Sequence, residues 1–120
     1  MHTERLLEHF RNPHGVGDLS APAVTVEVSN PACGDLMQLA VRFESGAVTE
    51  ARYRVRGCTA SIAAGSALTE WLAGKSAAAL AAFRTEAIEA ALGGLPAESK
   101  HAAVLCADAV RALLGSLPSQ

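Results

Sequence analysis

The hydrophobic pattern changes from the period of strands to that of helices at Gly57-Cys58, and this change constrains the fold more than any other feature. Before it, apolar and polar residues alternate over 24–28, 37–44 and 51–56, as half-buried strands do. Ser45-Gly46 separates the last two runs, so they predict an antiparallel hairpin. After it, small and apolar residues recur at helical spacing. The pattern therefore predicts an α+β domain, a three-stranded antiparallel sheet with helices packed on one face.

Helices are predicted on both sides of the strand region. A short amphipathic helix over 3–11 precedes the strands, and the second half predicts helices over 58–73, 75–83, 86–92 and 98–114. We expect Ser76 and Thr85 to cap two of them, because a hydroxyl can accept a hydrogen bond from the first-turn N–H groups. At 120 residues, the length predicts one domain spanning 1–120.

Composition excludes several classes of protein. Half of the residues are hydrophobic and 18% are charged, which argues against disorder, and the net charge of −2 argues against a general nucleic-acid binder. No uninterrupted apolar run is long enough for a membrane span, and no signal peptide is evident. Three cysteines without a CxxC pair argue against a disulfide framework. We therefore expect a cytoplasmic protein whose cysteines serve metal or thiol chemistry.

Two groups of polar residues admit more than one interpretation. Arginines at 42, 52, 54 and 56 share one face of the predicted hairpin, which is either a solvated face or a docking surface for an acidic partner. His9 and His14 flank the break after the first helix, where we expect exposed or capping side chains.

Cys33 and Asp35 lie in a turn-rich segment, NPACGD at 30–35, that can aim a thiolate and a carboxylate at one point. The strand after this segment pairs with the strand that ends at Gly57, so hairpin pairing brings Asp35 close to Cys58. Cys58 stands where a helix begins, and N–H groups there favour a thiolate. Cys33, Asp35 and Cys58 therefore form a plausible three-ligand set for a metal ion or an iron–sulfur cluster.

A fourth ligand has to come from the helical half, and His101 at the start of the last helix is the best candidate. Cys106 follows five residues later, about 140° further around a helix. One rigid helix can hardly offer both side chains to one metal, so we interpret Cys106 as a small buried residue. The alternative chemistry is thiol catalysis by a nucleophile–base pair of Cys58 and His101, which leaves Cys33 and Asp35 unexplained.

Taken together, these motifs resemble those of the IscU/NifU-type iron–sulfur cluster scaffold family. The resemblance extends over nearly the whole chain, from about residue 4 to 114, with the matching segments in order and at suitable spacing. The segments are EHFRNPHGVG at 8–17, NPACGD at 30–35, GCTASIAAGS at 57–66 and LAGKS at 72–76.

The resemblance implies a small SufE/NifU-like α+β domain that assembles a [2Fe–2S] cluster and passes it to recipient apo-proteins, without being an enzyme. It implies a cysteine desulfurase as sulfur donor, and zinc as a possible occupant in the isolated protein. Carried over by motif, the ligands to iron or the cluster are Cys33, Asp35, Cys58 and His101.

The chain departs from the family pattern at the last helix. Ala102 stands where the third cysteine of the family is expected, and Cys106 lies one turn later, about 6 Å along the axis. Cys106 could replace that cysteine only if the helix shifted or the metal sat deeper. The segment LPAES at 95–99 differs from the family's chaperone-recognition stretch. Two alternatives to a cluster scaffold follow: a zinc-bound persulfide acceptor for a desulfurase, and a domain that only binds a partner.

Overall fold

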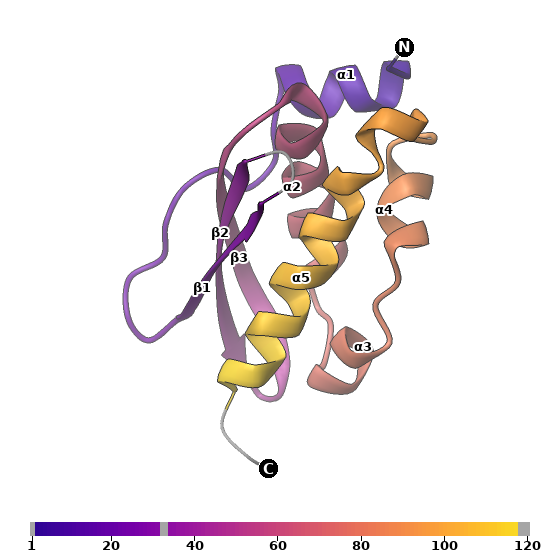
Figure 1. Cartoon of the computed structure of the whole chain (residues 1–120). Coiled ribbons are helices and arrows are strands. Elements are labelled where there is room, and N and C mark those ends of the chain that lie inside the picture. Colours follow the sequence, from indigo (N-terminus) through magenta and orange to yellow (C-terminus); the bar gives the residue numbers. More distant parts are fainter. Residues whose placement is uncertain (1, 32–33, 118–120) are drawn as a thin grey trace.

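Three antiparallel strands form one sheet in the order β1-β2-β3 (Figure 1). In the computed structural model, which describes residues 2–31 and 34–117, these strands are β1 Val24–Asn30, β2 Asp35–Glu44 and β3 Ala47–Arg56. The turn between β2 and β3 is formed by Ser45 and Gly46, whose φ angles of 55° and 81° are both positive. Two successive positive φ angles are typical of the tight turns that match the twist of a hairpin, so the predicted hairpin is confirmed.

The helices cover one face of this sheet, as predicted (Figure 1). The long helix α5, His101–Ser116, lies across β1 and β2, and α2, Thr59–Leu72, packs on β3. The remaining helices are α1 Glu4–Arg11, α3 Ala77–Ala81, α4 Thr85–Ala91 and the single 3₁₀ turn η1 Ala97–Ser99. Within 2–31 and 34–117, no helix has the length and hydropathy that crossing a membrane requires.

Several predicted helix ends are corrected. Ser76 caps α3 as expected, by accepting from the Ala79 N–H, but this helix is shorter than predicted. Thr85 is the first residue of α4 instead of its cap, and its hydroxyl contacts the Glu86 carboxylate. The predicted helix over 98–114 is divided, because η1 ends before α5 begins at His101. His101 therefore occupies the first turn of a new helix.

The core lies between the sheet and the two long helices. β2 contributes Met37, Leu39 and Val41, which are fully buried. The small residues of α2 let this helix approach β3 closely: a Cβ added at Gly65 would lie 2.3 Å from the ring of Tyr53. The Tyr53 hydroxyl donates to the carbonyl oxygen of Ile62, 2.7 Å away, which fixes α2 against the strand. This contact sets the position of the α2 N-terminus relative to the end of β3.

Arginines on the outer face of the sheet bind other parts of the same chain. Arg42 is only 19% exposed and donates to the carbonyl oxygens of Ser20 and Pro22. Arg54 forms a two-bond ion pair with Asp18, at 2.8 and 3.1 Å. The solvated-face interpretation is thus wrong for Arg42, because the segment before β1 folds back over this face.

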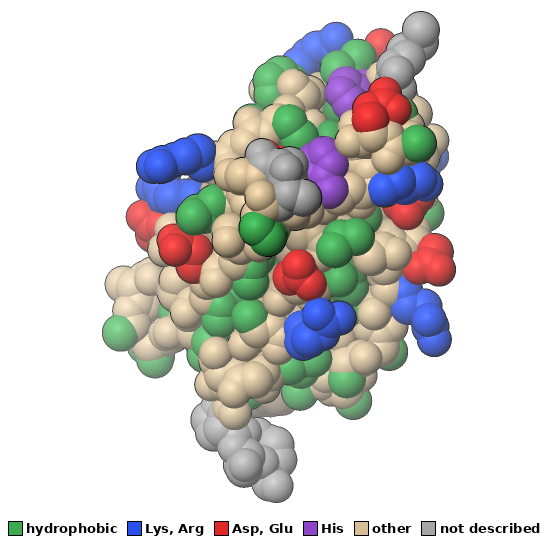
Figure 2. All heavy atoms as spheres, in the orientation of Figure 1, with side chains coloured by type: hydrophobic (Ala, Val, Ile, Leu, Met, Phe, Trp, Pro, Cys, Tyr) green, Lys and Arg blue, Asp and Glu red, His purple; other side chains and the backbone are tan. Residues whose placement is uncertain are grey.

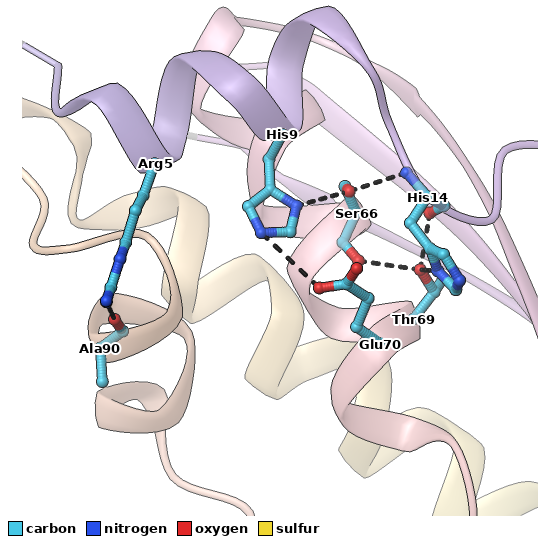
Figure 3. Close-up of polar contacts among 7 residues, drawn as sticks. All are labelled: Arg5, His9, His14, Ser66, Thr69, Glu70 and Ala90. Carbon is cyan, nitrogen blue, oxygen red and sulfur yellow. Dashed lines mark hydrogen bonds and ion pairs between the residues drawn. The ribbon is translucent and has the colours of Figure 1, made fainter.

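Two histidines, on α1 and in the loop after it, form polar contacts with side chains of α2 (Figure 3). The Nδ1 atom of His9 lies 2.7 Å from the Ser66 hydroxyl oxygen, which also accepts the backbone N–H of His14 at 2.8 Å. The His14 ring contacts the Thr69 hydroxyl at 3.1 Å, and His9 Nε2 lies 3.7 Å from the Glu70 carboxylate. The prediction of an exposed or capping residue is wrong for His9, which is 17% exposed and bound across helices.

Candidate metal centre

Three element ends meet at the upper end of the molecule in Figure 1. β2 begins at Asp35, Cys58 is the N-cap residue of α2, and α5 begins at His101. Leu36 pairs with Arg56 in the hairpin register, which places Asp35 beside the residues that follow β3. The expected proximity of Asp35 and Cys58 is therefore confirmed, and the start of α5 adds His101 from the third side.

The donor atoms of these three residues lie close together. Asp35 Oδ2 is 3.3 Å from Cys58 Sγ and 3.4 Å from His101 Nε2, and the sulfur and the ring nitrogen are 3.5 Å apart. Asp35 is 5% exposed, whereas Cys58 is exposed and the His101 side chain is 26% exposed. The site thus has a buried carboxylate at its base and a thiol open to solvent, so a metal ion or another protein can reach it.

The Asp35 carboxylate is stabilised in its charged form despite its burial. Burial alone would raise the pKa of this carboxyl group, but hydrogen bonds from the Ser61 hydroxyl, the Cys58 thiol and the Cys58 backbone N–H outweigh it, with help from the nearby His101. The net pKa lies below the ordinary value of an aspartate. A metal ligand has to be deprotonated, so this environment prepares Asp35 to bind a cation.

Two residues that support the site were not predicted as part of it. Ser61 lies on α2, is fully buried, and donates its hydroxyl to Asp35 Oδ2, with its oxygen 3.4 Å from Cys58 Sγ. At Gly57, an added Cβ would lie 2.6 Å from Asp35 Cγ, so only glycine leaves room for this carboxylate. In the sequence, Ser61 is one of the small residues that recur at helical spacing after Gly57-Cys58. Its spacing of three residues from Cys58, which puts both on one helix face, is the sequence signal that could have found it.

The three separations fit a single metal ion. Zinc binds sulfur at about 2.3 Å and nitrogen or oxygen at about 2.0–2.2 Å, so neighbouring ligands of a tetrahedral site lie about 3.4–3.6 Å apart. The described donors of Asp35, Cys58 and His101 are 3.3–3.5 Å apart and all lie within 4.8 Å of one another. Histidine side chains are visible in the upper half of Figure 2, where acidic and basic side chains are interspersed around them.

Among the described residues, Cys106 does not extend this set. Cys33 lies outside the described residues. Cys106 is fully buried, its Sγ lies 3.6 Å from the Ala64 carbonyl oxygen, and burial raises the pKa of its thiol well above the ordinary value. The interpretation of Cys106 as a core residue is confirmed. Ala102 is also fully buried, so this part of α5 offers no exposed thiol in place of the expected third cysteine.

Comparison with known proteins places the chain in a family. The family model described as the NifU-like N terminal domain matches residues 1–119, so the chain belongs to this family. It is 34% identical over 111 residues to iron-sulfur cluster assembly scaffold protein IscU 1 of Archaeoglobus fulgidus, a match that covers 92% of this chain and 72% of that protein. A scaffold protein IscU of Haemophilus influenzae is 34% identical over 117 residues, covering 94% of this chain and 92% of the relative.

Solved structures agree on the fold. A NifU-like protein (N-terminal) from Brucella abortus gives a TM-score of 0.63 at 24% identity, covering 92% of this chain and 77% of that chain. A putative iron-sulfur cluster assembly scaffold protein for the SUF system from Fervidobacterium islandicum gives a TM-score of 0.75 at 15% identity, with coverages of 93% and 95%. At these identities the likeness concerns the fold alone, and it confirms the predicted α+β architecture.

Proposed function

We propose that this chain is an iron–sulfur cluster assembly scaffold or carrier, a single domain over 1–120 that binds iron or a [2Fe–2S] cluster as cargo and hands it on without being an enzyme. The observation that carries the proposal is the meeting of Asp35, Cys58 and His101 within hydrogen-bond distances of one another. Family membership and the names of the IscU relatives support the same role.

Each ligand has a defined part in this proposal. Cys58 supplies a thiolate, the ligand type that iron–sulfur clusters prefer, and Cys33 supplies a second one from the segment between β1 and β2. Asp35 and His101 supply an oxygen and a nitrogen, which hold a cluster less firmly than thiolates do and suit a cargo that has to leave. A cysteine desulfurase would deliver sulfur and recipient apo-proteins would accept the cluster, both in the cytoplasm.

Anaerobic reconstitution tests the proposal. The purified chain is incubated with ferrous iron and sulfide under reducing conditions, and bound iron, bound sulfide and the visible absorption spectrum are measured after desalting. We expect Cys58→Ser to lose the cluster absorption and Cys106→Ala, the matched cysteine control, to retain it, because only Cys58 belongs to the site. Equal cluster yields in wild type and Cys58→Ser would refute the proposal. Absence of stoichiometric iron and zinc from the wild type would favour a domain that only binds a partner.

A zinc-bound persulfide acceptor is the second candidate, and the ligand geometry favours it specifically. In a [2Fe–2S] cluster each iron takes two protein ligands, whereas Asp35, Cys58 and His101 converge on the position of one tetrahedral ion. In this role Cys33 or Cys58 would receive sulfur from the persulfide of a cysteine desulfurase. Mass spectrometry after incubation with a desulfurase and cysteine distinguishes the candidates, because only the acceptor gains sulfur on a thiol without added iron.

A further inference from the structure

The Asp35 carboxylate is held on two sides by residues that are not themselves metal ligands, and the arrangement assigns a role to one of them. We infer that Ser61 is a positioning residue that keeps Asp35 a one-oxygen ligand, and that it thereby keeps the bound metal four-coordinate. The inference rests on the proposed metal-binding function and deepens it, since it concerns how many atoms the site gives to its metal.

The neighbours of Asp35 contact one particular oxygen of its carboxylate, Oδ2. The Ser61 hydroxyl donates to Asp35 Oδ2, and this same oxygen faces Cys58 Sγ at 3.3 Å and His101 Nε2 at 3.4 Å. A hydroxyl has one hydrogen to donate, and Ser61 is fully buried in the first turn of α2, away from competing water. One lone pair of Oδ2 is therefore occupied by Ser61, and the other remains for a metal between Cys58 and His101.

The Gly57 backbone restrains the carboxylate from another side. The position that a Cβ would take at Gly57 lies 2.6 Å from Asp35 Cγ, 2.7 Å from Oδ1 and 3.0 Å from Oδ2, so the whole carboxylate is packed against the backbone at Gly57, Oδ1 most closely of the two oxygens. Rotation about the terminal bond of an aspartate is otherwise soft, because this torsion has a broad distribution. The hydrogen bond from Ser61 on Oδ2 and the Gly57 backbone, which is closer to Oδ1 than to Oδ2, together restrain rotation of the carboxylate, so Oδ2 is the oxygen that faces Cys58 and His101.

Cobalt(II) reports coordination number directly, because its d–d bands are intense in four-coordinate sites and weaken when a fifth ligand enters. The full chain is titrated anaerobically with Co²⁺ in the wild type, Ser61→Ala, Ser61→Thr and the control Ser66→Ala, which removes a buried hydroxyl of the same helix that contacts the α1 side. We expect Ser61→Ala to keep the sulfur-to-cobalt charge-transfer band, to lose d–d intensity, and to bind Co²⁺ about 10- to 100-fold more weakly. Ser61→Thr and Ser66→Ala should keep the wild-type bands.

Thermal melting of the metal-free variants shows that each is folded before its spectrum is compared. A Ser61→Ala spectrum and affinity equal to wild type would overturn the inference while leaving the metal-binding proposal intact. Loss of d–d intensity in folded Ser61→Thr would also overturn it, because the hydroxyl would then be irrelevant. Failure of the wild type to bind one Co²⁺ per chain would overturn the metal-binding proposal itself, and the inference with it.

Discussion

Gly57→Ala is the substitution that tests the site geometry most severely with the smallest chemical change. The added Cβ would lie 2.6 Å from Asp35 Cγ, 2.7 Å from Oδ1 and 3.0 Å from Oδ2. Carbon atoms pack best at about 3.5–4.0 Å, so the carboxylate has to retreat by about 1 Å. Metal–ligand distances tolerate only about 0.2 Å, so Asp35 would leave the coordination range of an ion held by Cys58 and His101.

We expect Gly57→Ala to weaken zinc binding by at least about 10- to 100-fold, the effect of disturbing a residue that orients a ligand. Overpacking should also cost about 1–3 kcal/mol of unfolding free energy in the metal-free protein. Competition with a chromophoric chelator measures the zinc affinity, and urea denaturation measures the stability. Gly115→Ala is the matched control: apart from its chain neighbours and the nearby backbone of its own helix, no atom lies within 4 Å of its added Cβ, so it should preserve zinc affinity. Wild-type zinc affinity in folded Gly57→Ala would refute the assignment of Asp35 as a ligand.

Two further predictions concern buried groups. Cys106→Ala should leave metal content unchanged and lower the free energy of unfolding by about 0.5–1.5 kcal/mol. In the folded protein, iodoacetamide should modify Cys58 but not Cys106, because burial raises the pKa of the Cys106 thiol and only a thiolate is nucleophilic. Peptide mass mapping checks this, and rapid modification of Cys106 would contradict it. Tyr53, the single tyrosine, should ionise in an ultraviolet titration with a pKa of about 12, because burial disfavours its phenolate. Since its pKa is raised on folding, its contribution to stability is complete below pH ~10 and declines as the pH rises toward 12. A midpoint near 10 in the folded protein would contradict this prediction.

The fold and the centre of the site could be predicted because both follow from local periodicity. Alternating residues define β2 and β3, and the two-residue turn between them forces the start of one strand to meet the end of the other. Asp35 and Cys58 are then neighbours by register alone. His101 is the best candidate in the sequence for a ligand from the helical half, and the resemblance supports the same residue, but a histidine at the start of a helix does not by itself reveal which other elements lie near it.

Contacts between elements distant in sequence could not be predicted in the same way. Ser61 and Ala63 are both small residues of α2 in the sequence, yet the hydroxyl of Ser61 is used for Asp35, 26 residues earlier in the chain. The sequence predicts an exposed or capping His9. Its contact with Ser66 could not be predicted, because that contact depends on how α1 crosses α2. Polar side chains reveal their partners only after packing brings two elements together, whereas hydrophobic periodicity reveals the elements themselves.

The number of available thiols determines what kind of cluster this site could hold. Cys106 is buried and directed at the Ala64 carbonyl oxygen, and Ala102 has no sulfur, so Cys33 and Cys58 are the two cysteines left for coordination. A [2Fe–2S] cluster here would therefore combine two thiolates with Asp35 and His101. Replacing thiolates by neutral nitrogen ligands raises the reduction potential of such clusters, and weaker ligands exchange more readily. The same proposed donor set would make a complete tetrahedral site for zinc. In the proposed scaffold, one sulfur fewer would therefore ease the release of iron cargo and let zinc compete more strongly for the site.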